Sequence, residues 1–153
     1  KAAGLTTHTF EFDEGDANAN NFRYSNHKYI AYCFKRTPGL IGIGHYIGNS
    51  NADGPYVVID DGAAGFRPAW LMIKRAANSE NWYITDNARS LSNVNQTHLL
   101  ADSANAEASG SGTDFTANGF KVRASSNSVN ANDERLIYLA FSDQAFQLQA
   151  RAR

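Results

Sequence analysis

Apolar and polar positions alternate with a period of two along most of the chain, which predicts short β-strands. In the run "LIGIGHYIG" (40–48), isoleucines share one face of a strand and glycines line the other. A glycine-lined strand face indicates either a β-bulge or another backbone that packs closely over it. Further runs with this pattern are "TFEF" (9–12), "YIAYCF" (29–34), "PYVVID" (55–60), "AWLMIK" (69–74), "NWYIT" (81–85), "FKVRA" (120–124) and "LIYLAF" (136–141).

Turn signals separate these runs, and no stretch keeps a 3.6-residue apolar repeat with helix caps. Pro38-Gly39 has the order preferred in a type II turn, and Asn118-Gly119 between apolar runs indicates a hairpin. The run "WLMI" is expected to be a central strand covered on both faces. The run "THLLADSANAEA" (97–108) is expected to be a loop with at most one helical turn. The pattern predicts an all-β, antiparallel β-sandwich, jelly-roll-like, with little helix.

The end of the chain resembles its beginning, because "NANDERLIYLAF" (130–141) resembles "NANNFRYSNHKYIAYCF" (18–34). One interpretation is that two hairpins of one sandwich use similar sequences. The other is duplication, in which residues 1–36 are the closing strands of a preceding repeat and residues 37–153 are a complete sandwich repeat with a C-terminal tail. Corresponding positions are Phe10 and Phe120, Asn18 and Asn130, and Tyr29 and Tyr138, offset by 110, 112 and 109 residues.

Closing strands without their own repeat would need a partner, because an exposed strand edge promotes aggregation. They would pack on this domain or on a neighbouring copy, and the second choice links subunits by strand addition. The residues expected to take part in this linkage are Phe10, Phe12, Tyr29, Ile30 and Tyr32.

Length and charge narrow the classes of partner. A chain of 153 residues suits one domain or slightly more. A net charge of −1 without a basic block argues against nucleic acid as the main partner. No apolar run approaches the roughly 18 residues of a membrane span, so membrane insertion is not expected. The single cysteine, Cys33, excludes an internal disulfide and is expected to be a buried small hydrophobe.

No motif for catalysis or a cofactor is present, so no catalytic residue is assigned. A glycan-cleaving enzyme stays open as a third class, because its two carboxylates can come from distant strands. One string, "NSNADGPYVVID" (49–60), has the spacing of a calcium loop, although an Asp-Gly turn that leads into a strand explains the same residues. The weak calcium candidates are Asn49, Asn51, Asp53 and Asp60.

The segment "ENWYITDNARS" (80–90) is the candidate binding surface. If Trp82 and Ile84 face the core, Tyr83 points outward. An exposed aromatic ring beside amide, carboxylate and guanidinium groups suits a sugar. Alternatively, these side chains only cover a strand end. The candidate glycan-binding residues are Tyr83, Asp86, Asn87 and Arg89.

Four strings resemble a repeated β module of tailed-bacteriophage virion proteins, common in viruses of marine and cyanobacterial hosts. They are "GFRPAWLMIKR" (65–75), "NWYITDNAR" (81–89), "NGFKVR" (118–123) and "NANDERLIYLAFSD" (130–143), and the resemblance covers residues 26–153. The chain departs from the module at "VVIDDGAAGF" (57–66), where the loop is longer. The residues that match the specific motif, expected to be core and turn residues, are Phe66, Pro68, Trp70 and Met72.

The resemblance implies a structural virion protein, a module of a tail fibre or tail assembly, without an enzymatic role or cofactor. Expected partners are copies of itself, with a homotrimer preferred, other virion proteins, and a host-surface glycan as a further ligand. The alternative is a decoration or filament-forming structural protein linked by strand exchange between subunits.

Overall fold

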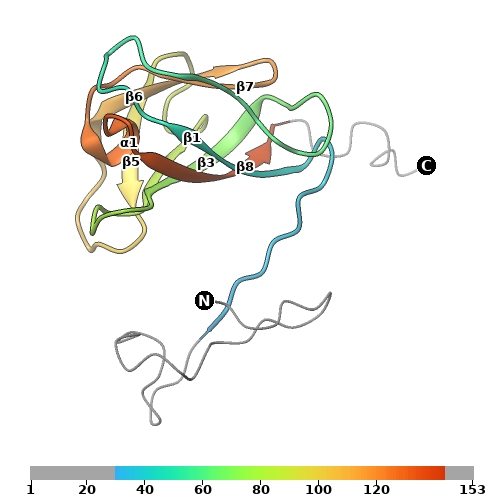
Figure 1. The fold of residues 1–153 in the computed structure, drawn as a ribbon, viewed down its shortest axis with the longest axis horizontal. Helices are drawn as coiled ribbons and strands as arrows, with labels where there is room; N and C mark the ends of the chain where they lie inside the picture. The colour runs from blue at the N-terminus through green and yellow to red at the C-terminus, as the bar shows by residue number, and fades with distance from the viewer. Residues whose placement is uncertain (1–29, 144–153) are drawn as a thin grey trace. The chain divides into compact units, whose positions relative to one another are not determined.

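The computed structural model describes residues 30–143, and residues 1–29 and 144–153 lie outside the described part. The chain divides into two units between Cys33 and Phe34. Residues 30–34 form no strand, so the strand predicted there is wrong for these residues, and Cys33 is exposed. The second unit contains, in chain order, β1 (Ile41–Ile47), β2 (Tyr56–Val58), β3 (Pro68–Arg75), β4 (Tyr83–Asp86), β5 (Asn95–Leu100), β6 (Ala108–Thr116), β7 (Gly119–Val122), α1 (Asn127–Asn130) and β8 (Arg135–Ser142) (Figure 1).

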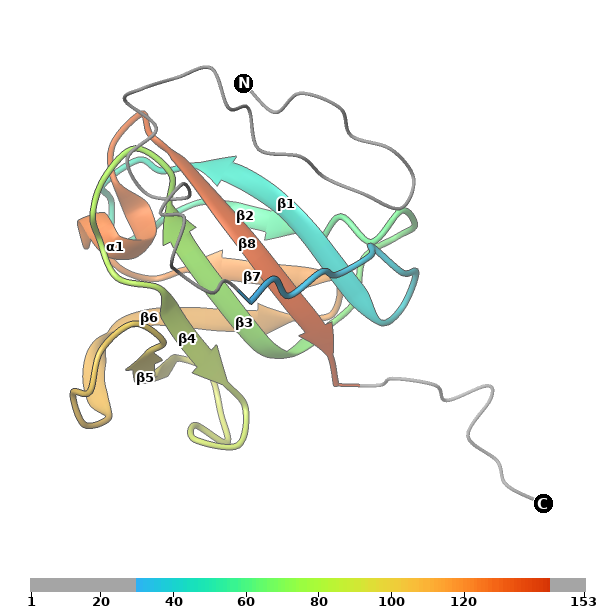
Figure 2. The same ribbon diagram turned by 90° about the horizontal axis from the view of Figure 1, so that it is seen from below.

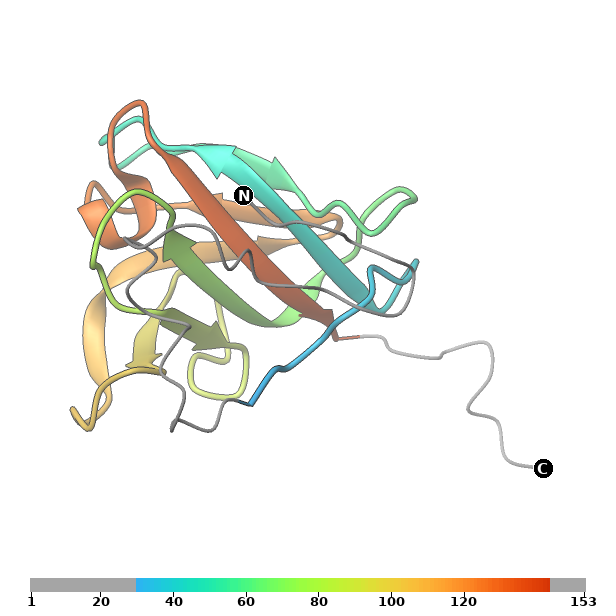
Figure 3. The same ribbon diagram turned by 60° about the horizontal axis from the view of Figure 1, so that its bottom comes forward.

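The strands of the described part form one sheet in the order β1-β8-β3-β4-β5-β6-β7-β2, and each neighbouring pair is antiparallel. The sheet curls through β5, so that β1, β8 and β3 face β6, β7 and β2 across the core (Figures 2 and 3). Its two ends come close, because the Ile43 amide donates to the Asp60 carbonyl at 3.1 Å. The predicted all-β antiparallel class with little helix is confirmed, and its two layers belong to a single, nearly closed sheet.

The core lies between the two layers and contains several aromatic rings. The ring of Phe120, which is fully buried, meets the rings of Tyr46 and Tyr138 edge to face at 5.7 and 5.4 Å. The Tyr46 hydroxyl donates to the Val129 carbonyl, so its polar end is satisfied within the core. The other buried apolar side chains of this cluster are Val57, Ile59, Phe66, Leu71, Ile73, Tyr83, Phe115, Val122, Val129, Leu136 and Ala140.

The glycine face of β1 points into this core, and the strand has no bulge; the close packing over it comes from side chains rather than from another backbone. A Cβ atom on Gly42 would lie 2.0 Å from Cγ2 of Ile59, and one on Gly44 would lie 2.6 Å from the Tyr138 hydroxyl. Both distances are far below van der Waals contact, so only glycine fits at this spacing of the layers. Because successive side chains alternate between faces, the isoleucines of β1 point away from the core.

The middle of the chain differs from its prediction in two places. β5 occupies residues expected to be a loop, and the Ser-Gly run 109–112 lies in β6. Glycine and serine have low strand propensity, but β6 is held by pairing on both sides, with β5 and with β7. The hairpin predicted at Asn118-Gly119 is confirmed, with Phe115 opposite Phe120. "WLMI" lies in a central strand as predicted, but Trp70 and Met72 are half-buried rather than fully covered.

Replacing Gly44 with alanine is expected to destabilise the protein by about 1–3 kcal/mol, the usual cost of overpacking a core. The added methyl would displace the Tyr138 ring, whose hydroxyl accepts a hydrogen bond from the Asp60 amide at 2.8 Å. Urea unfolding measures the effect. Ile47→Ala, on the half-exposed outer side of the same strand, is the control and should cost less than about 1 kcal/mol. Equal losses would contradict this account of β1.

Candidate functional site

The outer surface of β1, β8, β3 and β4 is apolar across all four strands. Directly opposed residues of antiparallel strands lie on the same face. The register places Leu139 opposite both Ile43 and Met72, and Met72 in turn opposite Ile84. We call this surface the outer apolar face, and its members are Ile41, Ile43, Ile47, Trp70, Met72, Ile84, Ile137, Leu139 and Phe141.

Three aromatic rings form one end of the outer apolar face. The ring of Phe141 lies 5.4 Å from that of Trp70 and 5.7 Å from that of Phe34. Phe34 precedes β1 in the chain and is itself exposed. The apolar surface therefore extends beyond the strands to the segment that leads into them.

Three members of the outer apolar face are exposed to solvent, whereas Leu139 at its centre is only 9% exposed and the other members are half-buried. The exposed fractions of Ile47, Ile137 and Ile43 are 50, 40 and 36%. Single exposed hydrophobic residues are normal on a soluble protein, but a contiguous set across several strands is typical of an interaction surface. The position of these residues in one register identifies the face as the candidate functional site.

The outer surface of the opposite layer has a different character. There, the Lys121 ammonium lies 2.8 Å from a carboxylate oxygen of Asp53, and the Arg123 guanidinium lies 3.3 Å from that of Asp114. Tyr56 and Val58 are half-exposed, and the Tyr56 hydroxyl donates to the Asn118 side chain. The outer surface of this layer thus mixes ion pairs with two exposed apolar side chains, whereas the outer apolar face carries aliphatic and aromatic residues across four strands.

Basic side chains gather at the end of the outer apolar face away from Phe141. His45 and Lys74 both lie opposite Ile137, and Arg135 lies opposite Ile47. The Lys74 ammonium donates to the carbonyls of Arg75 and Asn78, at 2.7 Å each. Within residues 30–143, the Arg135 side chain forms no ion pair, and it is exposed. This end therefore has positive charge available to a partner.

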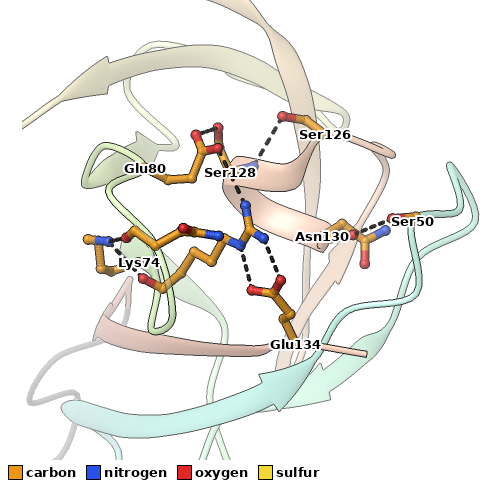
Figure 4. Close-up of polar contacts among 9 residues, drawn as sticks. Ser50, Lys74, Glu80, Ser126, Ser128, Asn130 and Glu134 are labelled. Carbon is orange, nitrogen blue, oxygen red and sulfur yellow. Dashed lines mark hydrogen bonds and ion pairs between the residues drawn. The ribbon is translucent and has the colours of Figure 1, made fainter. Parts of the chain in front are cut away.

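A charged cluster fixes the ends of the two central strands of this face (Figure 4). Arg75, at the end of β3, forms two hydrogen bonds with the Glu134 carboxylate just before β8, and its Nε lies 2.6 Å from Oε2. It also lies 3.5 Å from Glu80, which accepts a hydrogen bond from the Ser128 hydroxyl at 3.0 Å. A bidentate arginine–carboxylate pair constrains geometry strongly. The cluster therefore holds β3, β8 and α1 in one arrangement.

Asn130, the first residue of "NANDERLIYLAF", is fully buried and joins three segments. Its side-chain oxygen accepts from the Asn49 amide at 2.8 Å, and its side-chain nitrogen donates to the carbonyls of Asn51 and Ala124, each at 2.8 Å. Its own carbonyl accepts from the Ser50 backbone and hydroxyl (Figure 4). These bonds attach the loop after β1 to α1. The matching Asn18 lies outside the described residues.

The outward orientation predicted for Tyr83 is wrong. Tyr83 is only 2% exposed, because it lies opposite Ile73 on the core side of β4. Its hydroxyl donates to the Ser111 carbonyl at 2.5 Å, its ring stacks on His98 at 4.4 Å, and burial raises its pKa. Trp82 is exposed instead. The alternation of inward and outward side chains along β4 was predicted correctly, but the inward and outward positions were exchanged.

The other candidate glycan-binding residues form a turn held by internal contacts. The Arg89 guanidinium contacts a carboxylate oxygen of Asp86 at 2.8 Å and one of Glu107 at 2.6 Å. The second oxygen of Asp86 accepts from the backbone amides of Ala88 and Arg89, and the Asn87 amide donates to the Ala69 carbonyl. The structure therefore brings Asp86, Asn87 and Arg89 together, but without the Tyr83 ring.

The structure does not bring the calcium candidates together. The side-chain oxygens of Asn49 and Asn51 accept from the backbone amides of Asn51 and Asp53, which is the pattern of Asx turns. Asp53 is paired with Lys121, and Asp60 is paired with Arg36 at a distant loop. Among residues 30–143, no group of three or more histidine, cysteine or acidic side chains is arranged to hold a metal ion.

Of the residues predicted to link subunits, Phe10, Phe12 and Tyr29 lie outside the described residues. Ile30 and Tyr32 are exposed and belong to no strand. The candidate surface that the prediction missed is the outer apolar face. Its signal was present in the isoleucine face of β1 opposite a glycine face, but alternation does not reveal which face points inward.

Replacing Asn130 with aspartate is expected to lower the free energy of unfolding by on the order of 3 kcal/mol. The change puts a carboxylate oxygen where the side-chain nitrogen now donates to two carbonyls. Chemical denaturation at pH 7 measures it. Asn127→Asp, an exposed position in the same helical turn, is the control and should cost less than about 0.5 kcal/mol. Similar losses for both variants would contradict the role assigned to Asn130.

Replacing Glu134 with glutamine is expected to make the stability of the protein fall less steeply as the pH is lowered. The hydrogen bonds from Arg75 hold the pKa of Glu134 below its ordinary value of 4.5. The ionised carboxylate therefore stabilises the fold above that value, and the contribution is lost as the pH falls through the lower pKa of the folded state. Melting temperatures between pH 2 and 7 should fall less steeply for Glu134→Gln than for the wild type. Parallel curves would contradict this.

Comparison with known protein families gives a match to a domain of unknown function (DUF7483) over residues 2–145. No curated protein and no solved structure gives a significant match. Within the described residues, no helix is long and apolar enough to cross a membrane. The matched region spans most of the chain and includes every strand of the sheet. The chain therefore belongs to the DUF7483 family.

Proposed function

We propose that this chain is a structural module that assembles with other protein subunits through its outer apolar face. The proposal rests on one observation, the contiguous apolar register of β1, β8, β3 and β4 on the side facing away from the core. Apolar surface removed from water stabilises an association by about 25 cal/mol per Å². The ion-paired surface of the opposite layer has no comparable reason to be covered.

The setting we propose is the virion of a tailed phage, in a tail fibre or tail assembly. The strings at residues 65–75 and 130–143, which resemble the phage module, supply the central strands of this face and support the setting. Copies of the chain are the first partners, with a homotrimer preferred, and other virion proteins are further partners. Closed symmetry suits a fibre, whereas an open arrangement of the same contact would build filaments or a decoration layer.

The proposed role is geometric and involves no catalytic step. A rigid sheet with fixed strand ends presents one surface, and symmetric copies multiply weak contacts into a stable assembly. Asp86 and Arg89 bind each other within the turn after β4, and Tyr83 is buried in the core. Attachment to a glycan through Tyr83 is therefore not part of this proposal.

The double variant Ile43→Lys/Ile137→Lys is expected to weaken assembly by on the order of 100-fold, because it places two charges at the centre of the interface. Light scattering after size-exclusion chromatography measures the mass over a range of concentrations. Val58→Lys, a half-exposed aliphatic residue on the outer surface of the opposite layer, is the matched control and should leave the mass unchanged. A wild-type chain that stays monomeric, alone and with co-expressed virion proteins, would contradict the proposal.

A further inference from the structure

We propose that the outer apolar face of one copy binds residues 9–16 of a second copy. This inference rests on the proposed function and names the partner at its surface. Phe10 and Phe12 cover the aliphatic rows of the face, while the acidic residues that follow them meet the basic end formed by His45, Lys74 and Arg135. We call residues 9–16 the donor segment.

The sequence of the donor segment complements the face in both polarity and charge. It reads "TFEFDEGD", with phenylalanines at alternate positions and four acidic residues, and it contains no lysine or arginine. In an extended peptide, alternate side chains point to the same side, so Phe10 and Phe12 would contact the face together. Their separation matches that of Ile41 and Ile43, which are also two residues apart on β1.

Charge complementarity favours the donor segment as the partner of the outer apolar face, rather than the same face of a second copy. The basic end of the face carries Arg135, whose side chain has no ion pair within residues 30–143, beside His45 and Lys74. The carboxylates that a second face would offer at this end, Glu134 and Glu80, are already paired with Arg75 of their own chain. The donor segment carries Asp13, Glu14 and Asp16 directly after its second phenylalanine. Complementary charge of this kind fixes orientation and register more than it adds affinity.

Chain length and the position of Phe34 allow the donor segment to reach another molecule. Phe34 packs on Phe141, so the second unit of the chain begins at the aromatic end of the face. Ile30 follows Phe10 by 20 positions, and an extended peptide of that length spans up to roughly 66 Å. The family match begins at residue 2, so the donor segment and the face belong to the same family domain.

Such a contact is heterologous, because one patch binds a different patch on the next subunit. Each copy donates one segment and accepts one, so the assembly closes into a ring or grows as a filament. This distinguishes it from a face-to-face dimer, in which a single patch is buried against itself and no segment is exchanged.

A complementation experiment with full-length chains tests the inference. The donor variant Phe10→Ser/Phe12→Ser keeps the face, and the acceptor variant Ile43→Lys/Ile137→Lys keeps the donor segment. Each variant alone is expected to be monomeric by light scattering. An equimolar mixture is expected to form a 1:1 complex of about 33 kDa, twice the chain mass of 16.7 kDa, because only one pairing direction survives. Thermal melting of each variant verifies that it is folded.

The outcomes separate this inference from the proposed function. A donor variant that still associates like the wild type would overturn the inference and leave the proposed function standing, with a face-to-face dimer or another partner on the face. Two monomeric variants that do not complement each other would also overturn it, because the donor segment then acts within its own chain. A wild-type chain without any association would overturn both.

A charge-reversal pair gives a second test that does not alter the apolar contact. Arg135→Glu, at an exposed position, should weaken assembly by on the order of 10-fold, and Glu14→Lys/Asp16→Lys should weaken it similarly. Combining the three substitutions in one chain should restore most of the loss, since opposite charges meet again. Additive losses in the combined chain would overturn the proposed pairing of these residues.

Discussion

The fold depends on the close approach of its two layers at β1. At Gly42 and Gly44 the inner surface of this strand carries no side chain, and Ile59 and Tyr138 occupy the space there. The same spacing allows the Ile43 amide to reach the Asp60 carbonyl, which brings the two ends of the sheet together. A larger residue at either glycine would push the layers apart and open that contact, because protein cores are packed too densely to absorb a methyl group.

This constraint also determines the surface of the protein. With glycines turned inward, the isoleucines of β1 turn outward, and the register aligns them with Leu139 and Phe141 of β8. β8 is apolar on both faces, since Leu136, Tyr138 and Ala140 fill the core while the alternate residues form the outer apolar face. A strand that is apolar on both sides is typical of a position covered on both sides. Packing in the core explains why the inner face of β8 is apolar, but it does not explain why the outer face is apolar.

Polar clusters make the outer apolar face a fixed surface. The Arg75–Glu134 pair sets where β3 and β8 begin and end relative to each other, and Asn130 ties the loop after β1 to α1. Partly buried ion pairs contribute little net stability, because desolvation offsets their attraction. Their geometric requirements are strict, however, so they select one register. A surface used for assembly needs such a fixed register, since each copy must present the same contacts.

The sequence by itself determined the β class, most of the strands and the Asn118-Gly119 hairpin. These features follow from local periodicity and turn chemistry, which depend only on residues that are close together in the sequence. The tertiary structure decided which face of each strand points inward: Tyr83 is buried because Ile73 lies opposite it on the core side, and Ile43 is exposed because Ile59 fills the core beside Gly42. Alternation makes the two faces of a strand different, but residues distant in sequence determine which one is covered. The pairing of Ser109 with Thr97, which holds this part of the Ser-Gly run in β6, likewise does not follow from the run itself.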